Sequence, residues 1–433
     1  MVPQIRSRSE HNISRTQISD SALKVLYRLK KSGFEAYLVG GCVRDLLLGR
    51  EPKDFDVVTD ATPEQIRDTF RNCRLIGRRF RLAHIHFGRE IIEVATFRGT
   101  SQDGASDGAS NDRVMQNGRL LRDNIFGTIE EDVLRRDFTV NALYYNIRDF
   151  SVIDYVEGLK DHEKGLLRLI GDPEERYRED PVRMLRAVRF ATKLGFSIHP
   201  DCEEPIPRLA MLLTEISSAR LYDEVLKLLL SGYSLQAFEY LRHYHLFDAI
   251  FPETEKLLKV ESEGFPLTFL AKALENTDSR LAEGKPVTPY FLFSALLWEP
   301  VRLAAARRKD KGIPEVLALQ QAAGEVISKQ VKRTAFPKRV SIPMREVWDL
   351  QARLNITKGV RPFRLLGHPR FRAAYDFLLL RAETGEAEPA LAEWWTRFQE
   401  ASEKERKTMT KSMGKRRRKG SVKSTRTRKP KAE

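Results

Sequence analysis

The stretch that decides the fold lies between residues 38 and 56. It reads Leu38-Val39-Gly40-Gly41-Cys42-Val43-Arg44-Asp45, with Asp54-Phe55-Asp56 shortly after it. The segment Ala36–Val39 predicts a short buried strand, and Val43–Leu48 predicts a helix that ends at Gly49. A strand that enters a Gly-Gly turn and then a helix brings backbone N–H groups close to whatever lies in the turn. Phosphate suits that position, and Arg44 at the helix start can add a positive charge.

Asp54 and Asp56 stand two residues apart in a predicted strand over Phe55–Thr59, so both side chains point to one face. Two carboxylates about 6–7 Å apart along a strand can converge on a pair of Mg²⁺ ions ~4 Å apart. Nucleotidyl transfer uses such a pair, because one cation activates the attacking hydroxyl and the other neutralises the leaving pyrophosphate. A lone Asp-x-Asp pair is usually structural. Here apolar neighbours place the charges in a core strand, where they need compensation.

A third carboxylate, Glu93, lies inside the apolar strand predicted over Ile91–Phe97. If that strand neighbours Phe55–Thr59, Glu93 would complete a three-carboxylate metal site. The alternative is an ion pair with an arginine such as Arg98. His84 and His86 share one face of the preceding strand, predicted over Ala83–Phe87, but no further His or Cys cluster supports a metal site there.

Two later motifs also combine acids with arginines. In Arg135-Arg136-Asp137, an arginine could hold triphosphate, and Asp137 could bond a ribose hydroxyl or support the carboxylate cluster. The alternative makes Asp137 an N-cap beside solvated arginines.

In Glu179-Asp180-Pro181-Val182-Arg183, Pro181 marks a helix start with Asp180 as its N-cap. Arg183 then lies beside Asp180, so the carboxylate could accept from the N6 amine of adenine while the guanidinium donates to N1. A capping salt bridge explains the same spacing.

The predicted fold class is α+β. An N-terminal head with a mixed β-sheet and helices precedes an all-helical neck and body and a disordered basic tail. The expected divisions are a flexible arm over 1–18, the head over 19–150, the neck over 151–260, the body over 261–400 and the tail over 401–433. Within the head, 101–118 repeats Asp-Gly-Ala-Ser and is expected to be a disordered loop.

Charge and cysteine content narrow the class of protein. The 433 residues carry a formal charge of +15, and 14 lysines and arginines against three acids place most of it after residue 400. Such a tail favours nucleic acid first and an anionic membrane surface second. Three separate cysteines indicate a reducing compartment, without a disulfide framework or a cysteine zinc site. No apolar run is long enough for a membrane span, and the first 19 residues lack the apolar core of a secretory signal.

Taken together, these motifs resemble the bacterial poly(A) polymerase and tRNA CCA-adding family, class II of the DNA polymerase β-type nucleotidyltransferases. The resemblance runs from about Leu38 to Pro252. It rests on Gly-Gly-x-Val-Arg-Asp, Asp-x-Asp, Arg-Arg-Asp-Phe-Thr-x-Asn-Ala and Glu-Asp-x-x-Arg, in that order. It implies an enzyme that uses ATP with Mg²⁺ or Mn²⁺, a head that holds the metal site, and helical regions that read the nucleotide and grip RNA.

The residue patterns and the resemblance together give expected roles for particular residues. The expected catalytic residues are Asp54, Asp56 and Asp137, and the expected metal ligands are Asp54, Asp56 and Glu93. The expected nucleotide-binding residues are Gly40, Gly41, Arg44, Asp45, Arg136, Asp137, Asn141, Asp180 and Arg183, the last two serving as a protein template for the base. The expected RNA-binding residues are Arg78, Arg79, Arg81, Arg186, Arg189, Arg416, Arg417 and Arg418.

Within the family, the sequence is more similar to the poly(A) polymerases. The basic segment from Gly77 to His84 and the Arg/Lys-rich C-terminus resemble that branch, and no His-Asp phosphohydrolase signature appears in the C-terminal half. This branch implies polyadenylation of mRNA and small-RNA 3′ ends in the cytoplasm, feeding RNA decay, with an RNA chaperone such as Hfq as a possible partner. CCA addition to tRNA is the alternative. A binding protein that has lost catalysis and a two-metal nuclease or cyclase are the rival classes.

Overall fold

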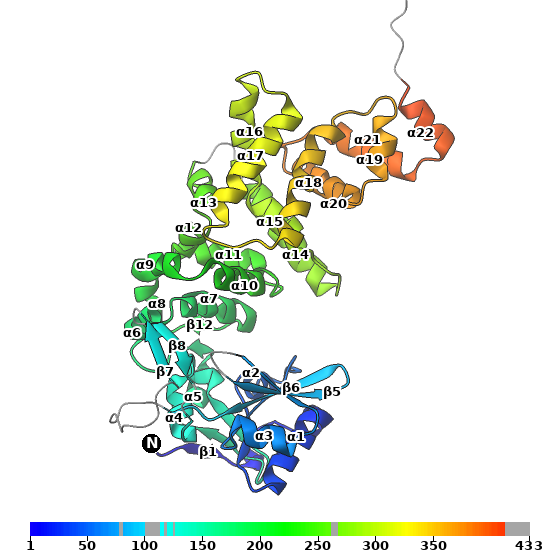
Figure 1. Cartoon of the computed structure of the whole chain (residues 1–433). Coiled ribbons are helices and arrows are strands. Elements are labelled where there is room, and N and C mark those ends of the chain that lie inside the picture. Colours follow the sequence, from blue (N-terminus) through cyan, green and yellow to red (C-terminus); the bar gives the residue numbers. More distant parts are fainter. Residues whose placement is uncertain (78–80, 100–112, 117–118, 124–125, 261–266, 412–433) are drawn as a thin grey trace, which may run out of the picture.

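The computed structural model describes residues 1–77, 81–99, 113–116, 119–123, 126–260 and 267–411. The chain forms an elongated molecule in which a head built on a sheet is followed by a helical neck and a helical body (Figure 1). The α+β class expected from the sequence is confirmed, because strands gather in the head and helices dominate the rest.

The head is built on an eight-stranded sheet in the order β1-β10-β9-β2-β3-β6-β5-β4. Neighbouring strands pair antiparallel except β3 and β6, which run parallel. The bounds in that order are Gln4–Arg6, Val152–Asp154, Leu143–Asn146, Ala36–Val39, Asp56–Thr59, Glu90–Thr96, Leu82–Phe87 and Cys73–Ile76. The strands predicted over 36–39, 55–59, 83–87 and 91–97 are therefore present, within one or two residues of the expected ends.

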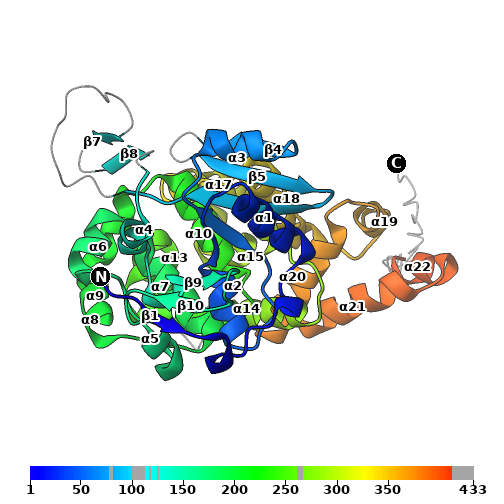
Figure 2. The same ribbon diagram turned by 90° about the horizontal axis from the view of Figure 1, so that it is seen from below.

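Side chains alternate between the two faces of this sheet, so each strand contributes apolar residues to both faces. Leu38 and Val57 join one apolar cluster, while Val39 and Val58 join another. Helix α1 (Asp20–Lys31) packs on the first face, and helix α3 (Pro63–Thr69) lies over β4 and β5 (Figure 2). Helices α2 (Gly41–Leu47), α4 (Ile129–Arg135) and α5 (Gly158–Lys164) complete the head.

The prediction of a flexible arm over 1–18 is wrong. Strand β1 pairs with β10, so that Ile5 lies opposite Ile153 at the edge of the sheet. Short 3₁₀ turns follow at Arg8–Glu10 and Arg15–Gln17, and Ile13 and Ile18 are buried. The segment is polar overall, so its sequence gave little indication of a strand. The pairing of β1 with β10 orders it.

The neck carries helices and one small sheet. Its helices are α6 (Pro173–Glu179), α7 (Val182–Leu194), α8 (Pro200–Glu203), α9 (Pro205–Leu209), α10 (Ser218–Leu229), α11 (Ser234–His243), α12 (Leu246–Ile250) and α13 (Pro252–Leu258). The all-helical prediction for 151–260 is wrong in two places. Strand β10 belongs to the head sheet, and β11 (Leu166–Leu167) pairs in parallel with β12 (Ser197–Ile198).

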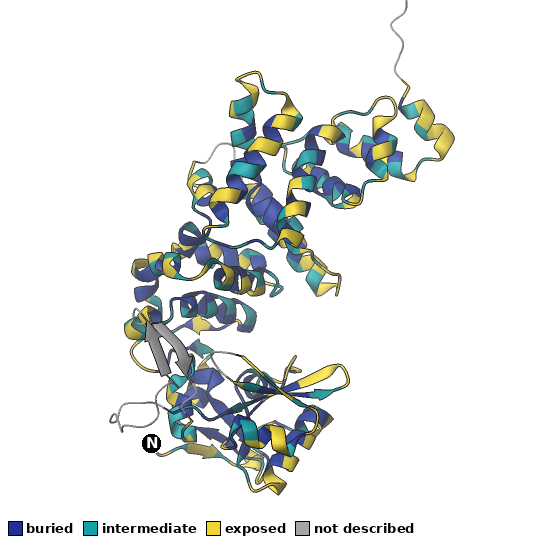
Figure 3. Cartoon of the chain, in the orientation of Figure 1, coloured by how far each residue is buried: buried dark blue, intermediate teal, exposed yellow. Residues whose placement is uncertain are grey.

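The body is helical throughout its described part. Its helices are α14 (Leu267–Ala282), α15 (Pro289–Leu296), α16 (Trp298–Lys309), α17 (Glu315–Gln330), α18 (Lys338–Leu354), α19 (Arg361–Leu366), α20 (Phe371–Glu383) and α21 (Pro389–Glu400). One apolar cluster runs from Phe138 through the neck to Leu380, so neck and body share a core, and their buried faces meet in Figure 3.

Two segments expected to be disordered contain regular structure. Strand β8 (Arg119–Asp123) pairs with β7 (Arg113–Gln116), which falls inside the loop predicted over 101–118. Helix α22 (Glu403–Met409) begins with a Ser402 cap inside the tail predicted over 401–433. The remaining parts of both predictions, 101–112 with 117–118 and 412–433, lie outside the described residues. In the described part of the chain, no helix has the length and apolar character needed to cross a membrane.

Candidate active site

Three acidic side chains meet at the start of strand β3. Asp56 is its first residue, and the parallel pairing with β6 places Asp56 directly opposite Glu93. Asp54 lies two residues earlier in the chain. The next strand, β5, places His84 opposite Glu93, and His84 Nε2 lies 3.2 Å from Glu93 Oε1. The condition set by the sequence, that the strand of Glu93 neighbours that of Asp56, is met.

The pKa of Asp56 is shifted by its burial first and by the nearby charges second. Desolvation by the surrounding protein raises the pKa of Asp56, Glu93 and Asp54 raise it further and Arg136 lowers it, with a result of about 6. The ionised forms of the three carboxylates therefore repel one another. A divalent cation would relieve that repulsion, and carboxylate oxygens are the ligands that Mg²⁺ prefers. The residues present thus fit a divalent metal.

The carboxylates supply oxygen ligands for a metal ion, but they are not arranged around one common position. Among the residues that the structure describes, no three His, Cys, Asp or Glu side chains are grouped tightly enough to hold an ion as they stand. Asp54 and Asp56 are exposed to solvent, which leaves them accessible to a metal–nucleotide complex.

The Gly40-Gly41 turn leads from β2 into α2, as expected. Gly40 has φ +79°, in the left-handed region that a side chain would strain. A Cβ there would lie 3.7 Å from Arg136 Nη1, so the Arg136 guanidinium stands against the turn. Arg44 is buried rather than free. It donates to Asp45 Oδ1 at 2.9 and 2.6 Å and also to Asn141 Oδ1, so its predicted phosphate contact stays a prediction.

Arg136 is held in place by two buried residues of the head. Its Nε and Nη2 donate to Asp132 Oδ2 at 3.0 and 2.9 Å, and Nε also donates to the Tyr144 hydroxyl at 2.9 Å. Tyr144 in turn donates to Asp132 at 2.8 Å. Burial lowers the pKa of Arg136, but Asp132 and Tyr144 outweigh it and raise the pKa overall. A fixed positive charge therefore faces both Asp56 and the glycine turn.

Asp132 and Tyr144 were missed by the sequence analysis. Asp132 precedes Arg136 by four residues, a spacing that could have suggested an ion pair at the end of helix α4. Tyr144 gave no local signal, because it comes from strand β9 and meets Arg136 only through the fold.

Asp137 is engaged by the neck. Arg186 of helix α7 donates Nε to Asp137 Oδ2 at 2.8 Å and Nη2 to the same oxygen, and the Phe138 N–H donates to Oδ1 at 2.8 Å. Burial raises the pKa of Asp137, but Arg186 and these hydrogen bonds lower it overall. The acidic groups that act on Asp56 are Glu93 and Asp54, so Glu93 stands closer than Asp137 to the role of third carboxylate.

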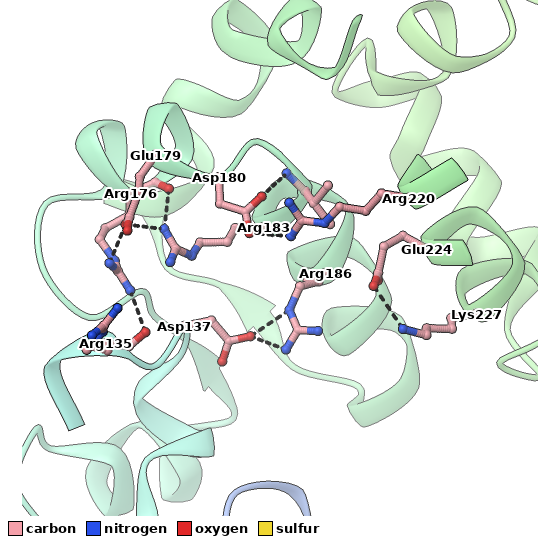
Figure 4. A network of polar contacts seen from close by, with 11 residues as sticks. Arg135, Asp137, Arg176, Glu179, Asp180, Arg183, Arg186, Arg220, Glu224 and Lys227 are labelled. Carbon is pink, nitrogen blue, oxygen red and sulfur yellow. Dashed lines mark hydrogen bonds and ion pairs between the residues drawn. The ribbon is translucent and has the colours of Figure 1, made fainter. Parts of the chain in front are cut away.

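The salt bridge between Asp180 and Arg183, which was the alternative explanation of their spacing, does not form, and each side chain has another partner (Figure 4). Asp180 Oδ2 accepts from Arg220 Nη2 at 2.6 Å, and Arg183 Nη1 donates to Glu179 Oε2 at 2.7 Å. Helix α7 also begins one residue later than expected, with Pro181 in the cap position. Arg220 follows Asp180 by forty positions and lies on α10, so spacing along the chain could not reveal it.

One arginine of helix α6 joins the neck to the head. Arg176 Nη2 donates to the carbonyl oxygens of Arg136 at 2.7 Å and Arg135 at 3.3 Å, and Nη1 donates to Glu179 Oε2 at 2.6 Å (Figure 4). The neck is thereby attached to the backbone next to Asp137.

The predicted RNA-binding arginines divide into three groups. Arg186 and Arg189 face the protein itself, because Arg186 bonds Asp137 and Arg189 lies over the Phe190 ring at 4.3 Å. Arg81 is exposed and pairs with Glu64 at 2.5 Å. Arg78, Arg79, Arg416, Arg417 and Arg418 lie outside the described residues.

The mixed-sheet head, its carboxylates on adjacent strands and its glycine turn, followed by a helical neck, define a nucleotidyltransferase. Comparison with known proteins agrees. Three family models match, described as Poly A polymerase head domain over 36–168, Probable RNA and SrmB- binding site of polymerase A over 195–258, and Polymerase A arginine-rich C-terminus over 311–432. The chain belongs to the poly(A) polymerase family.

Individual relatives show the extent of the match. Poly(A) polymerase I of Salmonella typhi is 52% identical over 405 residues, which cover 93% of this chain and 87% of the relative. Poly(A) polymerase I of Haemophilus influenzae is 46% identical and covers 93% of this chain and 89% of the relative. A crystal structure of a Bacillus stearothermophilus CCA-adding enzyme in complex with CTP is similar with a TM-score of 0.57 and 25% identity, covering 87% of this chain and 80% of that one.

Proposed function

We propose that this chain adds adenylate from ATP to RNA 3′ ends without a nucleic-acid template. The RNA 3′-oxygen bonds to the α-phosphorus of ATP, the bond from that phosphorus to the β-phosphate oxygen breaks, and pyrophosphate and the hydroxyl proton are released. Membership of the poly(A) polymerase family supports the reaction. The observation that carries the site is the register that sets Asp56 opposite Glu93, beside the Gly40 turn.

Asp54, Asp56 and Glu93 would hold Mg²⁺ or Mn²⁺ at this site. Bound there, the cations would activate the attacking hydroxyl and neutralise the leaving pyrophosphate. Asp56 and Glu93 stand opposite each other on two adjacent strands, and both Glu93 and Asp54 raise the pKa of Asp56.

The nucleotide is positioned from two ends. Arg136, fixed by Asp132 and Tyr144, is placed to bind the triphosphate at the glycine turn. Asp180 accepts a hydrogen bond from the adenine amine and Arg183 donates to ring N1, each held by its own partner in the neck. Asp137 and Asn141, which share a hydrogen bond of 3.3 Å, are proposed to orient the ribose.

The proposal extends to RNA binding, the cellular compartment and the partner proteins. The neck matches a family region described as a probable RNA-binding site, and the basic C-terminal segment suits the phosphate backbone in a salt-sensitive way. Three free cysteines agree with a cytoplasmic setting. An RNA chaperone such as Hfq and RNA-decay enzymes are proposed partners through the family resemblance alone.

The function is tested by incubating the chain and Mg²⁺ with a 3′-hydroxyl RNA and each nucleoside triphosphate separately. We expect a ladder of added residues with ATP alone, because the neck presents one acceptor and one donor to the base edge. A short addition of C, C and A confined to tRNA ends would support CCA addition instead. Shortening of the RNA would indicate a nuclease, and no change would indicate a binding protein.

Metal binding should depend on pH through Asp56. A cation competes with the proton of this carboxyl, whose pKa is about 6 in the metal-free chain. We expect the Kd for Mn²⁺, measured by titration without nucleotide, to rise about tenfold between pH 7 and pH 5. Asp56→Asn should remove this dependence, and a Kd that is flat over the same range in the unaltered chain would contradict it.

A further inference from the structure

Arg176 contacts both halves of the nucleotide site. Its side chain donates from Nη2 to the Arg136 carbonyl at 2.7 Å, which belongs to the residue placed against the triphosphate. Its own backbone carbonyl accepts from Arg183 Nη1 at 2.7 Å, which belongs to the residue placed against the base. The close-up in Figure 4 shows the Arg176 side chain reaching from α6 toward the segment that carries Asp137.

A second link runs through Glu179. Its Oε2 accepts from Arg176 Nη1 at 2.6 Å and from Arg183 Nη1 at 2.7 Å, so one carboxylate oxygen joins both guanidinium groups. These contacts form an unbroken series from the Arg136 backbone in the head to the Arg183 side chain in the neck. Arg136 is the C-terminal cap of α4 and Arg183 lies in α7, so these two arginines belong to separate elements.

The burial of Arg176 argues against an incidental surface contact. Its side chain is 15% exposed, and its Nε is buried without a hydrogen-bond partner among the described residues. Burying a guanidinium is unfavourable unless its partners compensate it. Here the partners are one carboxylate and two backbone carbonyls, and the carbonyls belong to the segment that holds the phosphate-binding arginine.

We propose that Arg176 is a positioning residue that sets the separation between the phosphate-holding and base-reading ends of the nucleotide site. The proposal rests on the proposed function. ATP binds both ends at once, so its affinity depends on each end and also on their spacing, as for any ligand with two linked contacts. Adenine, which lacks the ribose, uses the base end alone and inorganic tripolyphosphate uses the phosphate end alone, so neither depends on the spacing.

The test compares these three ligands in Arg176→Gln and Arg176→Lys. For Arg176→Gln we expect the KM for ATP to rise about tenfold. The inhibition constants of adenine and tripolyphosphate should stay within about twofold. Arg176→Lys keeps the charge but not the fork of donors. Its KM for ATP should therefore lie between those of the unaltered chain and Arg176→Gln. Arg178→Gln is the matched control on the same helix, because Arg178 is exposed and pairs with Glu174 at 2.6 Å.

Each result of this test either supports or overturns the proposed role of Arg176. An unchanged KM for ATP in both Arg176 variants overturns the proposal. So does an equal loss for adenine or tripolyphosphate, since Arg176 would then build one end rather than the spacing, and so does an equal effect of Arg178→Gln. If Arg176→Gln unfolds early in a thermal melt, the Arg176→Lys comparison carries the test. If adenine and tripolyphosphate fail to compete with ATP in the unaltered chain, the proposed nucleotide site itself is wrong.

Discussion

Asp56→Asn is expected to lower kcat for adenylate addition by on the order of 10³-fold, equivalent to ~4 kcal/mol of transition-state stabilisation. The substitution keeps the size of the side chain and removes the charge that faces Glu93 and Asp54. Incorporation of labelled ATP into RNA measures the effect. The double variant Asp54→Ala with Asp56→Ala should show no incorporation.

The same substitution should stabilise the metal-free chain. The pKa of Asp56 rises from the ordinary 3.8 to about 6 on folding, so the folded chain takes up a proton between these pH values. The contribution of Asp56 to stability is therefore highest below pH 3.8 and is lost as the pH rises toward 6. At pH 7 the ionised carboxylate is unfavourable, so Asp56→Asn should raise Tm while it lowers activity.

A control separates this pattern from a general effect of charge. Asp68→Asn on α3 removes an exposed carboxylate, with 72% of its side chain accessible, that pairs with Arg67 at 3.4 Å. We expect it to change neither activity nor Tm appreciably. Adding Mn²⁺ should raise Tm for the unaltered chain and much less for Asp56→Asn. Near-normal adenylate incorporation by Asp56→Asn would refute the proposed site.

Loss of Arg136 is expected to have the second-largest effect. Arg136→Lys should lower kcat/KM for ATP by about 10²-fold, because a lysine cannot reproduce the planar fork that bonds Asp132 and Tyr144 and faces the glycine turn. Steady-state kinetics at fixed RNA measure it. Arg136→Ala should lose more, and it also leaves the buried Asp132 carboxylate without its cation, which costs about 3–5 kcal/mol of stability.

Tyr144→Phe distinguishes positioning of Arg136 from mere stability. It deletes the hydroxyl that accepts from Arg136 Nε and donates to Asp132, without altering charge. We expect a smaller loss in kcat/KM, about tenfold, that appears mainly in the KM for ATP. Arg67→Ala, an exposed arginine of α3, is the control. Equal activity of Arg136→Lys and the unaltered chain would remove Arg136 from the nucleotide site.

Much of the head could be predicted because its signals are local. Apolar segments marked β2, β3, β5 and β6. The start of α3 has an equally local signal in Thr62 before Pro63, and the structure contains the capping box of Thr62 and Gln65. The N-terminal segment could not be predicted, because β1 is polar and ordered only by pairing with β10. The strands β11 and β12 are two residues each, too short for any periodicity.

In the candidate site, too, some residues could be identified from the sequence and their partners could not. Asp54, Asp56 and Glu93 were identifiable because they are carboxylates among apolar residues. The expected position of Asp54 and Asp56 in a core strand is wrong, because both are exposed and Asp54 precedes β3. The partners of these and the other site residues were not identifiable. Asp180 meets Arg220, Asp137 meets Arg186 and Arg136 meets Tyr144, each across separate elements. The spacing of Asp180 and Arg183 suggested a local pair that does not form, because each has a closer partner elsewhere.

The sequence by itself determined which residues are candidates for the chemistry, since motif order, carboxylates among apolar residues and glycine at a turn are properties of neighbouring positions. Only the tertiary structure decided how those residues are paired and held. It set Asp56 against Glu93 through a parallel strand pair, fixed Arg136 on Asp132 and Tyr144, and joined head to neck through Arg176. The physical reason is that hydrogen bonds and ion pairs act over a few ångströms in space, whatever the distance along the chain.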